Sequence, residues 1–174
     1  MRWAALWLAI GWAQIWEVRA ILEGQTTRPI SLRFISELYT EEVSGTLQEG
    51  RALVSTKLVQ SPKEVILSAP GYLPVRLIYP CGQGKVLDFS NPDCLHPNSA
   101  HILGPNGRAM LAAGELGSLP DNPRPVINAY DIELFLQAEK VQDTRADFNG
   151  DGRVDDQDFH LLLKNQALLL QTDL

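Results

Sequence analysis

Short runs of β-forming residues, separated by turn signals, occupy the middle of the chain. Apolar and polar residues alternate over positions 30–34, and a run rich in branched aliphatic side chains follows at 53–59. Further runs continue the pattern at residues 64–68, 72–79, 101–103 and 108–111. Strands at this spacing, with no convincing helix between them, predict a mainly β fold, an antiparallel sandwich over residues 21–113.

The apolar residues change to a helical period only in the last third of the chain. Phe159, Leu162 and Leu163 recur at i, i+3, i+4 spacing, and a similar apolar pattern lies 27 residues earlier. This spacing predicts two helices, each of which begins where a polar loop ends. A small α-helical module of two loop–helix repeats is therefore expected behind the sandwich. The apolar residues 167–170 either extend the last helix against the β domain or form a partner-facing tail.

The first twenty residues predict export from the cell. Arg2 precedes residues 3–16, which hold no charge and one polar side chain, and Val18-Arg19-Ala20 offers small residues for cleavage. The apolar run is shorter than the roughly 20 residues that span a bilayer. Gly11-Trp12-Ala13 is a second possible cleavage site, and an uncleaved anchor is the remaining alternative. All four tryptophans precede residue 17, so cleavage after Ala20 leaves none. The protein is expected to be secreted or on a bacterial cell surface.

Export also decides how the two cysteines are interpreted. Cys81 and Cys94 are the only cysteines, and an even pair in an oxidising compartment is most simply one disulfide. The bond would close a turn-rich loop of 14 residues and stabilise the fold by roughly 3 kcal/mol. A metal site would need more Cys or His residues at ligand spacing.

The net charge of -6 is confined to the end of the chain. Residues 21–114 hold eight acidic and eight basic residues, whereas residues 115–174 hold twelve acidic and five basic residues. Nucleic-acid binding is disfavoured, because it selects basic surfaces. The question is therefore what the acidic charge of the last third does.

A twelve-residue motif in this acidic part predicts a calcium site. Residues 147–158 read D-F-N-G-D-G-R-V-D-D-Q-D, with oxygen-bearing side chains at loop positions 1, 3, 5, 9 and 12 and glycine at position 6. Calcium takes about six to eight oxygen ligands in a flexible cage, and the glycine permits the sharp turn around the ion. The expected ligands are Asp147, Asn149, Asp151, the carbonyl of Arg153, Asp155 and Asp158.

A second, altered copy of this motif lies upstream. Alignment of residues 126–136 with residues 153–163 places Asn128 at position 9 and Asp131 at position 12. Glu115 then falls at position 1, and five extra residues lie in the proline-rich stretch 118–125. This first loop is expected to bind calcium through Glu115, Asp121, Asn128 and Asp131, to bind it weakly, or not to bind it.

Two loop–helix units with Asp at position 12 resemble a type I dockerin module, over residues 114–166. In that family the module docks a cohesin domain of another protein, in extracellular assemblies such as those that degrade polysaccharides. The resemblance implies partner-binding residues at loop positions 10 and 11, which are Ala129, Tyr130, Asp156 and Gln157.

A second resemblance concerns the β domain. Residues 68–74, S-A-P-G-Y-L-P, resemble the hairpin of transthyretin-like or carboxypeptidase-regulatory-like modules of exported bacterial proteins. Independently of the resemblance, Gly71 supplies the free backbone that the turn needs, and Tyr72 is expected to start the returning strand.

These features together predict a secreted, non-catalytic, calcium-binding interaction protein with a cohesin-like partner. The alternative is a self-assembling structural subunit of a surface layer or fibre, in which calcium only stabilises the folded subunit. An enzyme is disfavoured because the clustered carboxylates serve as ligands and no nucleophile–base spacing remains. Ion binding and folding are coupled when the unfolded chain has no site, so chelation is expected to unfold residues 115–166 while the β domain persists.

Overall fold

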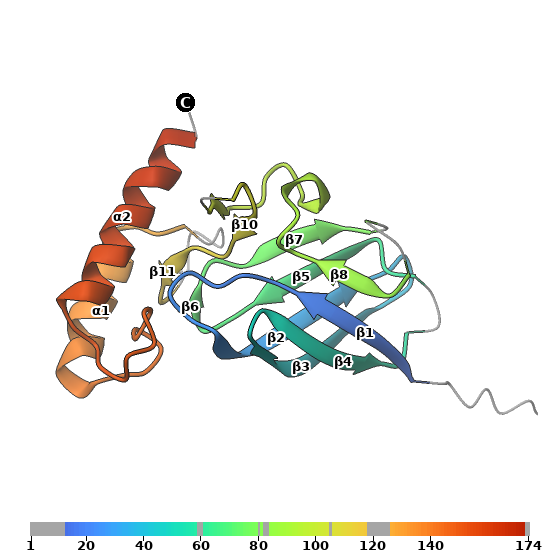
Figure 1. Cartoon of the computed structure of the whole chain (residues 1–174), viewed down its shortest axis with the longest axis horizontal. Helices are drawn as coiled ribbons and strands as arrows, with labels where there is room; N and C mark the ends of the chain where they lie inside the picture. Colours follow the sequence, from blue (N-terminus) through green and yellow to red (C-terminus); the bar gives the residue numbers. More distant parts are fainter. Residues whose placement is uncertain are drawn as a thin grey trace, which may run out of the picture.

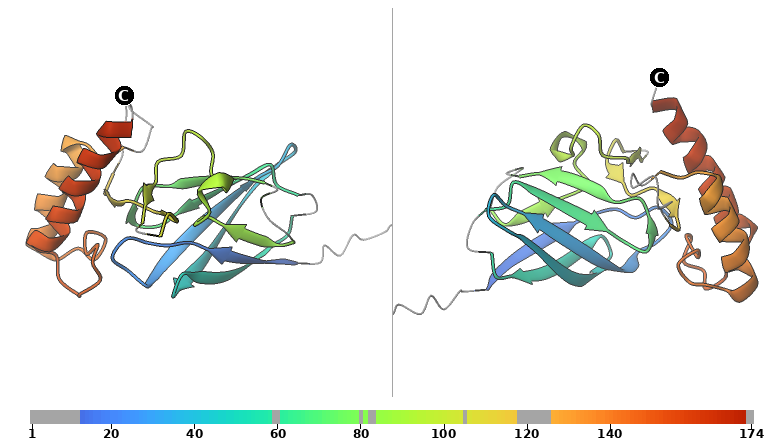
Figure 2. Two further views of the ribbon diagram at one scale, coloured as in Figure 1. Left: turned by 45° about the horizontal axis from the view of Figure 1, so that its top comes forward. Right: turned by 180° about the vertical axis from the view of Figure 1, so that it is seen from behind.

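The computed structural model describes residues 13–58, 61–79, 81, 84–104, 106–117 and 126–172. Within these residues a β domain and a pair of helices lie side by side, with the helices packed against one end of the β domain (Figure 1). The turned views in Figure 2 show the same arrangement. No helix in the described ranges is both long and apolar enough to cross a membrane.

A seven-stranded sheet forms most of the β domain, in the order β7-β5-β2-β3-β4-β1-β8. All neighbours in this sheet are antiparallel except β1 and β8, which are parallel. Strands β3 and β4 share the single residue pair Gln48 and Arg51, and the sheet bends there into the two layers seen in Figure 2. The expected mainly β fold with two C-terminal helices is confirmed. The strands are β1 (Gln14–Arg19), β2 (Thr27–Ile35), β3 (Thr40–Gln48), β4 (Arg51–Thr56), β5 (Glu64–Ser68), β7 (Val75–Ile78) and β8 (Val86–Asp88).

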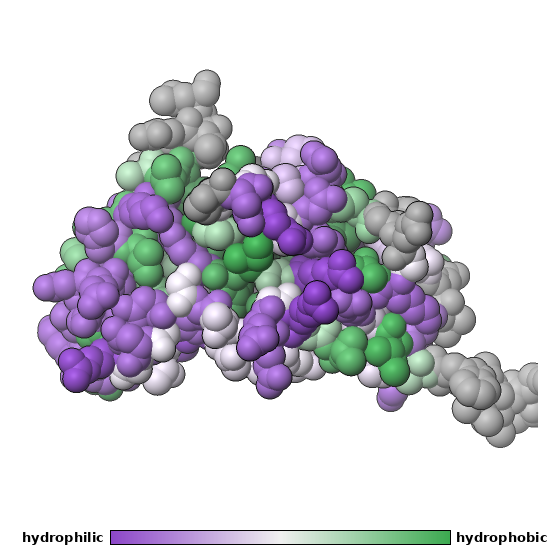
Figure 3. Space-filling view, in the orientation of Figure 1, coloured by the Kyte–Doolittle hydropathy of each residue, from purple (hydrophilic) through white to green (hydrophobic). Residues whose placement is uncertain are grey.

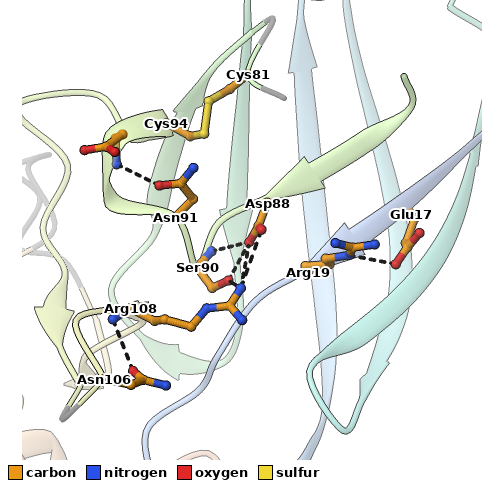
Figure 4. Close-up of polar contacts among 10 residues, drawn as sticks. Glu17, Arg19, Cys81, Asp88, Ser90, Asn91, Cys94, Asn106 and Arg108 are labelled. Carbon is orange, nitrogen blue, oxygen red and sulfur yellow. Dashed lines mark hydrogen bonds and ion pairs between the residues drawn. A yellow bond between two sulfur atoms is a disulfide. The ribbon is translucent and has the colours of Figure 1, made fainter. Parts of the chain in front are cut away.

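Two short ribbons and a disulfide complete the β domain. Strand β6 (Gly71–Tyr72) pairs with β11 (Ala113–Glu115), and β9 (Ile102–Leu103) pairs with β10 (Ala109–Met110). The predicted disulfide between Cys81 and Cys94 is confirmed, with the Cα atoms 5.5 Å apart, and it ties the end of the sheet to the short helix η1 (Pro92–Cys94) (Figure 4).

A polar contact holds the β9–β10 ribbon against the sheet. Figure 4 shows Arg108 reaching from this ribbon to Asp88, the last residue of β8, and to Ser90, two residues later. Asp88 also accepts a hydrogen bond from the main-chain N–H of Ser90 (3.0 Å). The Ser90 hydroxyl donates to the Asp88 carboxylate, so these three residues join the ribbon to the end of β8.

The sequence pattern locates β2, β4, β5, β7, β9 and β10, but not the polar strand β3 or the short strands β8 and β11. The expectation that Tyr72 starts the strand returning along β5 is wrong. Tyr72 lies in β6 opposite Ala113, and the returning strand β7 begins at Val75, opposite Leu67. Pro74 separates the two strands, since proline lacks the N–H that a sheet interior needs.

The first strand lies inside the segment that was expected to be removed on export. Trp16 is 2% exposed, its indole N–H donates to Oγ1 of Thr56 (3.1 Å), and its ring packs on Phe34. The β domain therefore begins at Gln14 rather than at residue 21. Cleavage after Ala20 would remove β1 from between β4 and β8, whereas cleavage after Ala13 would leave β1 whole.

The two helices share one hydrophobic core with the β domain. They are α1 (Ala129–Val141) and α2 (Asp156–Thr172). Phe135 of α1 and Leu162 of α2 belong to the same buried cluster as Tyr72 and Leu111 of the β domain. The boundary expected between residues 113 and 114 thus falls inside β11, which pairs with the β domain.

Candidate functional site

The candidate calcium loop, residues 147–158, connects α1 to α2 and faces the end of the β domain (Figures 1 and 2). Its two end carboxylates are buried, with Asp147 8% and Asp158 0% exposed. Asp151, Gly152 and Arg153 lie at the exposed tip. In the view of Figure 3 the surface over this connection is hydrophilic. The loop thus presents polar groups outward and encloses two acids.

Asp158, at position 12, is the centre of the loop's hydrogen bonds. Its Oδ1 accepts from the main-chain N–H groups of Phe148 (2.7 Å) and Asn149 (3.0 Å), and its Oδ2 accepts from that of Asp155 (3.1 Å). Burial raises the pKa of the Asp158 carboxyl, and these N–H groups oppose the rise. One carboxylate therefore joins the start of the loop to its end.

The other acids and the asparagine shape the turns between these ends. Asp147 accepts from the N–H groups of Gly150 (2.8 Å) and Gly152 (3.1 Å). Asn149 accepts from Asp151 N–H (2.9 Å), and Asp151 in turn accepts from Arg153 N–H (2.9 Å). Gly152 has φ +87, a conformation that a residue with a Cβ rarely adopts. The motif residues thus fold the loop back on itself.

This donor set fits a calcium ion. The side chains of Asp147, Asn149, Asp151, Asp155 and Asp158 and the Arg153 carbonyl would hold it, and all are hard oxygen donors. Neither buried carboxylate forms an ion pair with a basic side chain in the part of the chain that the structure describes. In these same ranges no three His, Cys, Asp or Glu side chains converge tightly enough to hold a metal as they stand, so the carboxylates would turn inward on binding.

Asp131 in the first loop repeats the hydrogen bonds of Asp158. Its Oδ1 accepts from Leu116 N–H (2.8 Å) and Gly117 N–H (3.3 Å), and its Oδ2 accepts from Asn128 N–H (2.9 Å). Leu116, Gly117 and Asn128 therefore occupy the places of Phe148, Asn149 and Asp155. This geometry supports the alignment of the two units, with Glu115 matching Asp147.

Among its described residues, the first loop offers fewer side-chain oxygen donors than the second. Position 3 is Gly117, which has no side chain, and Asp121 lies outside the described residues. Asn128 is the N-cap of α1, and its side chain accepts from Tyr130 N–H (2.8 Å). Asp131 completes a capping box with Asn128 at the start of α1, and Asp155 and Asp158 make the corresponding hydrogen bonds at the start of α2.

The expected partner-binding residues lie at the starts of the two helices. Ala129, Asp156 and Gln157 are exposed, so they are accessible to a partner. Tyr130 is half-buried, and its ring lies 3.6 Å from the point where a Cβ of Gly117 would be. Tyr130 thus covers the first loop as well as facing outward.

Side chains of the β domain donate hydrogen bonds to the candidate calcium loop and to the residues just before it, and the sequence did not predict these contacts. Arg28 donates to the carbonyls of Thr144 (3.1 Å) and Arg145 (3.0 Å), just before the loop. Tyr72 donates to the carbonyl of Phe148 (3.2 Å), and Gln25 donates to that of Asp147. Burial raises the pKa of Tyr72, which keeps its hydroxyl a donor. No sequence signal marks these residues, because their partners are distant main-chain carbonyls.

Helix α2 is anchored to the β domain through a buried acid. Glu23, 5% exposed, accepts from Lys164 Nζ (2.9 Å) and from the amide of Asn165. Asn165 is fully buried and also donates to the carbonyl of Ala113 (2.9 Å). The loop and the helix that follows it are therefore both fixed to the β domain.

No protein-family model matches the chain, and none of the curated proteins does. A solved structure does match: a chain in the crystal structure of a type II cohesin–X-dockerin complex from Acetivibrio cellulolyticus, a C-terminal interface mutant. That chain is 14% identical, and the alignment covers 87% of this chain and 94% of that chain with a TM-score of 0.54. At this identity the similarity is one of fold.

The aligned share of the chain is larger than the β domain. Residues up to the end of β11 make up about two thirds of the chain, so an alignment over 87% also includes much of the loop–helix part. The similarity therefore extends beyond the strands of the β domain.

Proposed function

We propose that this chain is an exported, non-catalytic interaction module whose loop–helix part binds one calcium ion and docks a cohesin-like protein. Residues 147–158 carry the proposal, because they combine two buried carboxylates, a complete set of oxygen donors and a glycine turn at the start of a helix. A bound ion would neutralise the buried charge and hold the exposed starts of α1 and α2 in place.

The fold comparison supports a docking role. The matched chain comes from a complex between a cohesin and an X-dockerin, and the aligned share of this chain extends into its loop–helix part. Polysaccharide-degrading or other surface assemblies are the setting in which such a module would act.

Surface plasmon resonance against a purified type II cohesin domain tests this function. Binding is expected in calcium and is expected to be lost in a chelator, because the ion holds the helix starts. The double variant Asp156→Ala, Gln157→Ala should lower affinity at least tenfold if these exposed residues face the partner. The matched control is Glu133→Ala, Gln137→Ala, a pair exposed further along α1.

Two other outcomes of this experiment would count against the proposed function. Cohesin binding that is unchanged by the chelator contradicts the calcium-dependent mechanism. Absence of binding, together with calcium-driven polymerisation of the purified chain, would favour the structural subunit of a surface layer or fibre.

A second candidate function is that the β domain itself receives a dockerin-type partner, as a cohesin does. The mainly β fold and the cohesin in the matched complex favour it. Ile15 (62%) and Leu53 (73%) are exposed on the neighbouring strands β1 and β4, and Figure 3 shows a hydrophobic area over the start of β1. Binding of a purified dockerin that is lost in Ile15→Ser, Leu53→Ser would support it, and no binding would exclude it.

A further inference from the structure

Val154, at position 8 of the calcium loop, has both main-chain groups bonded to one side chain. It is 3% exposed, its N–H donates to Oε1 of Gln142 (3.0 Å), and its carbonyl accepts from Nε2 of Gln142 (3.0 Å). The side-chain amide of Gln142 thus forms hydrogen bonds with both main-chain groups of Val154, as the main chain of a neighbouring strand would. Val154 lies between Arg153 and Asp155, so these hydrogen bonds hold the part of the loop that carries two expected ligands.

Gln142 adopts a backbone conformation that disfavours it. It ends α1 in the left-handed region, with φ 54 and ψ 47, and its N–H donates to the carbonyls of Ala138 and Glu139. Glycine is the usual residue at such a helix end, because any Cβ is strained there. A glutamine at this position therefore indicates that its side chain has a role that glycine could not fill.

No described residue of the first unit supplies this main-chain partner. Ile127 is the equivalent of Val154 under the 27-residue repeat, and it is also buried (6% exposed). The hydrogen bonds of Val154 nevertheless go to Gln142, from the helix that precedes the loop. The second loop is thus held by its own neighbouring helix.

We propose that Gln142 is the positioning residue of the calcium loop, replacing the paired main chain of a second loop and allowing residues 147–158 to bind an ion alone. The proposal rests on the calcium site of the proposed function. The two hydrogen bonds order the middle of the loop before an ion binds. The conformational entropy lost on calcium binding is therefore smaller.

The test compares Gln142→Gly and Gln142→Met with the wild-type protein. Gln142→Gly relieves the backbone and removes the amide, whereas Gln142→Met keeps the strain and the length but removes both hydrogen bonds. Calcium titration calorimetry should show about tenfold weaker binding for both variants, as expected for two lost hydrogen bonds. Amide exchange measured without calcium should become faster at Val154.

Glu49→Gly is the matched control. Glu49 is the other non-glycine residue with positive φ in the described ranges (φ 48), and it lies between β3 and β4, where its N–H donates to the carbonyl of Thr26. Its replacement should raise stability without changing calcium affinity.

The outcomes separate this proposal from the proposed function. Unchanged affinity and unchanged Val154 exchange in both variants would overturn the role of Gln142 and leave the calcium site standing. A wild-type protein that binds no calcium would overturn the site first and the positioning role with it.

Discussion

Two glycines at the junction show how single residues permit the calcium loop to lie against the β domain. A Cβ on Gly71 would collide with the carbonyl of Arg145, and a Cβ on Gly24 would lie 2.5 Å from the carbonyl of Phe148. Both positions thus need the missing side chain for close approach. The main chains of loop and β domain meet directly there.

Gly71→Ala is therefore expected to lower the free energy of unfolding by more than the backbone strain of a positive φ alone would. Gly107→Ala is the control, because Gly107 has a similar positive φ (+72 against +83) but open space around it. Both variants lose about 1 kcal/mol to backbone strain, and Gly71→Ala should lose at least about 1 kcal/mol more by displacing the loop. Urea denaturation measures the difference; equal losses would show that the contact at Gly71 is unimportant.

The loop at residues 147–158 was predictable from sequence, whereas the residues that hold it against the rest of the molecule were not. The spacing of Asp147, Asn149, Asp151, Asp155 and Asp158 encodes a local loop, so a local motif suffices to recognise it. Arg28, Tyr72, Gln25 and Gln142 act on main-chain carbonyls far along the chain or across a helix end. Contacts of this kind leave no periodic or spacing signal.

At the scale of elements, the place of β1 between β4 and β8 leads to a prediction about the N-terminus. We predict that the exported protein begins at Gln14 and keeps Trp16, since the tryptophan is buried against Phe34 and Tyr79. Intact-mass measurement of the secreted protein and its tryptophan fluorescence test this. A mature protein beginning at Ile21 that still unfolds cooperatively would contradict the place of β1 in the sheet.

The pattern failed at β1 because a strand and the end of an export signal can look alike. Residues 14–19 are mostly apolar on one face, and they adjoin the long apolar run that favours a signal peptide. β3 was missed for the opposite reason, since Thr40–Gln48 is largely polar and its side chains are mostly exposed or half-buried. Strand pairing, rather than local hydrophobicity, fixes both elements.

The anchoring of α2 gives a second prediction at this scale. Lys164→Met leaves the buried Glu23 carboxylate with the amide of Asn165 alone, which should lower the free energy of unfolding by about 1–3 kcal/mol. Lys63→Met is the control, because the Lys63–Glu37 pair is exposed and should contribute nothing measurable. Urea denaturation of both variants decides it, and equal stability would show that Lys164 does not anchor α2.

At the scale of the molecule, the shared core changes what chelation should do. The sequence led us to expect separate unfolding of residues 115–166, yet Phe135, Phe148 and Leu162 are buried with residues of the β domain. We now predict one cooperative transition whose midpoint rises with calcium. Circular dichroism melts at a helix and a strand wavelength should coincide in both conditions; two separate transitions would restore the independent-domain interpretation.

Five of the twelve acidic residues of the last third lie in the loop at 147–158, which connects the helices and contacts the β domain. Its two buried acids carry no basic partner in the described residues, and a calcium ion would supply the missing positive charge. Asp131 has the same hydrogen bonds in the first loop, but position 3 of that loop is Gly117, which brings no side-chain oxygen. The two loops are expected to differ in ion binding despite their shared geometry.

Calcium titration calorimetry of the secreted protein tests this account most directly, with Asp158→Asn and Asp131→Asn as the matched pair. We predict one ion per chain for the wild type, at least a roughly hundredfold loss of affinity in Asp158→Asn, and one ion bound with unchanged affinity in Asp131→Asn. Absence of calcium binding by the wild type, or binding that survives Asp158→Asn, would contradict the account.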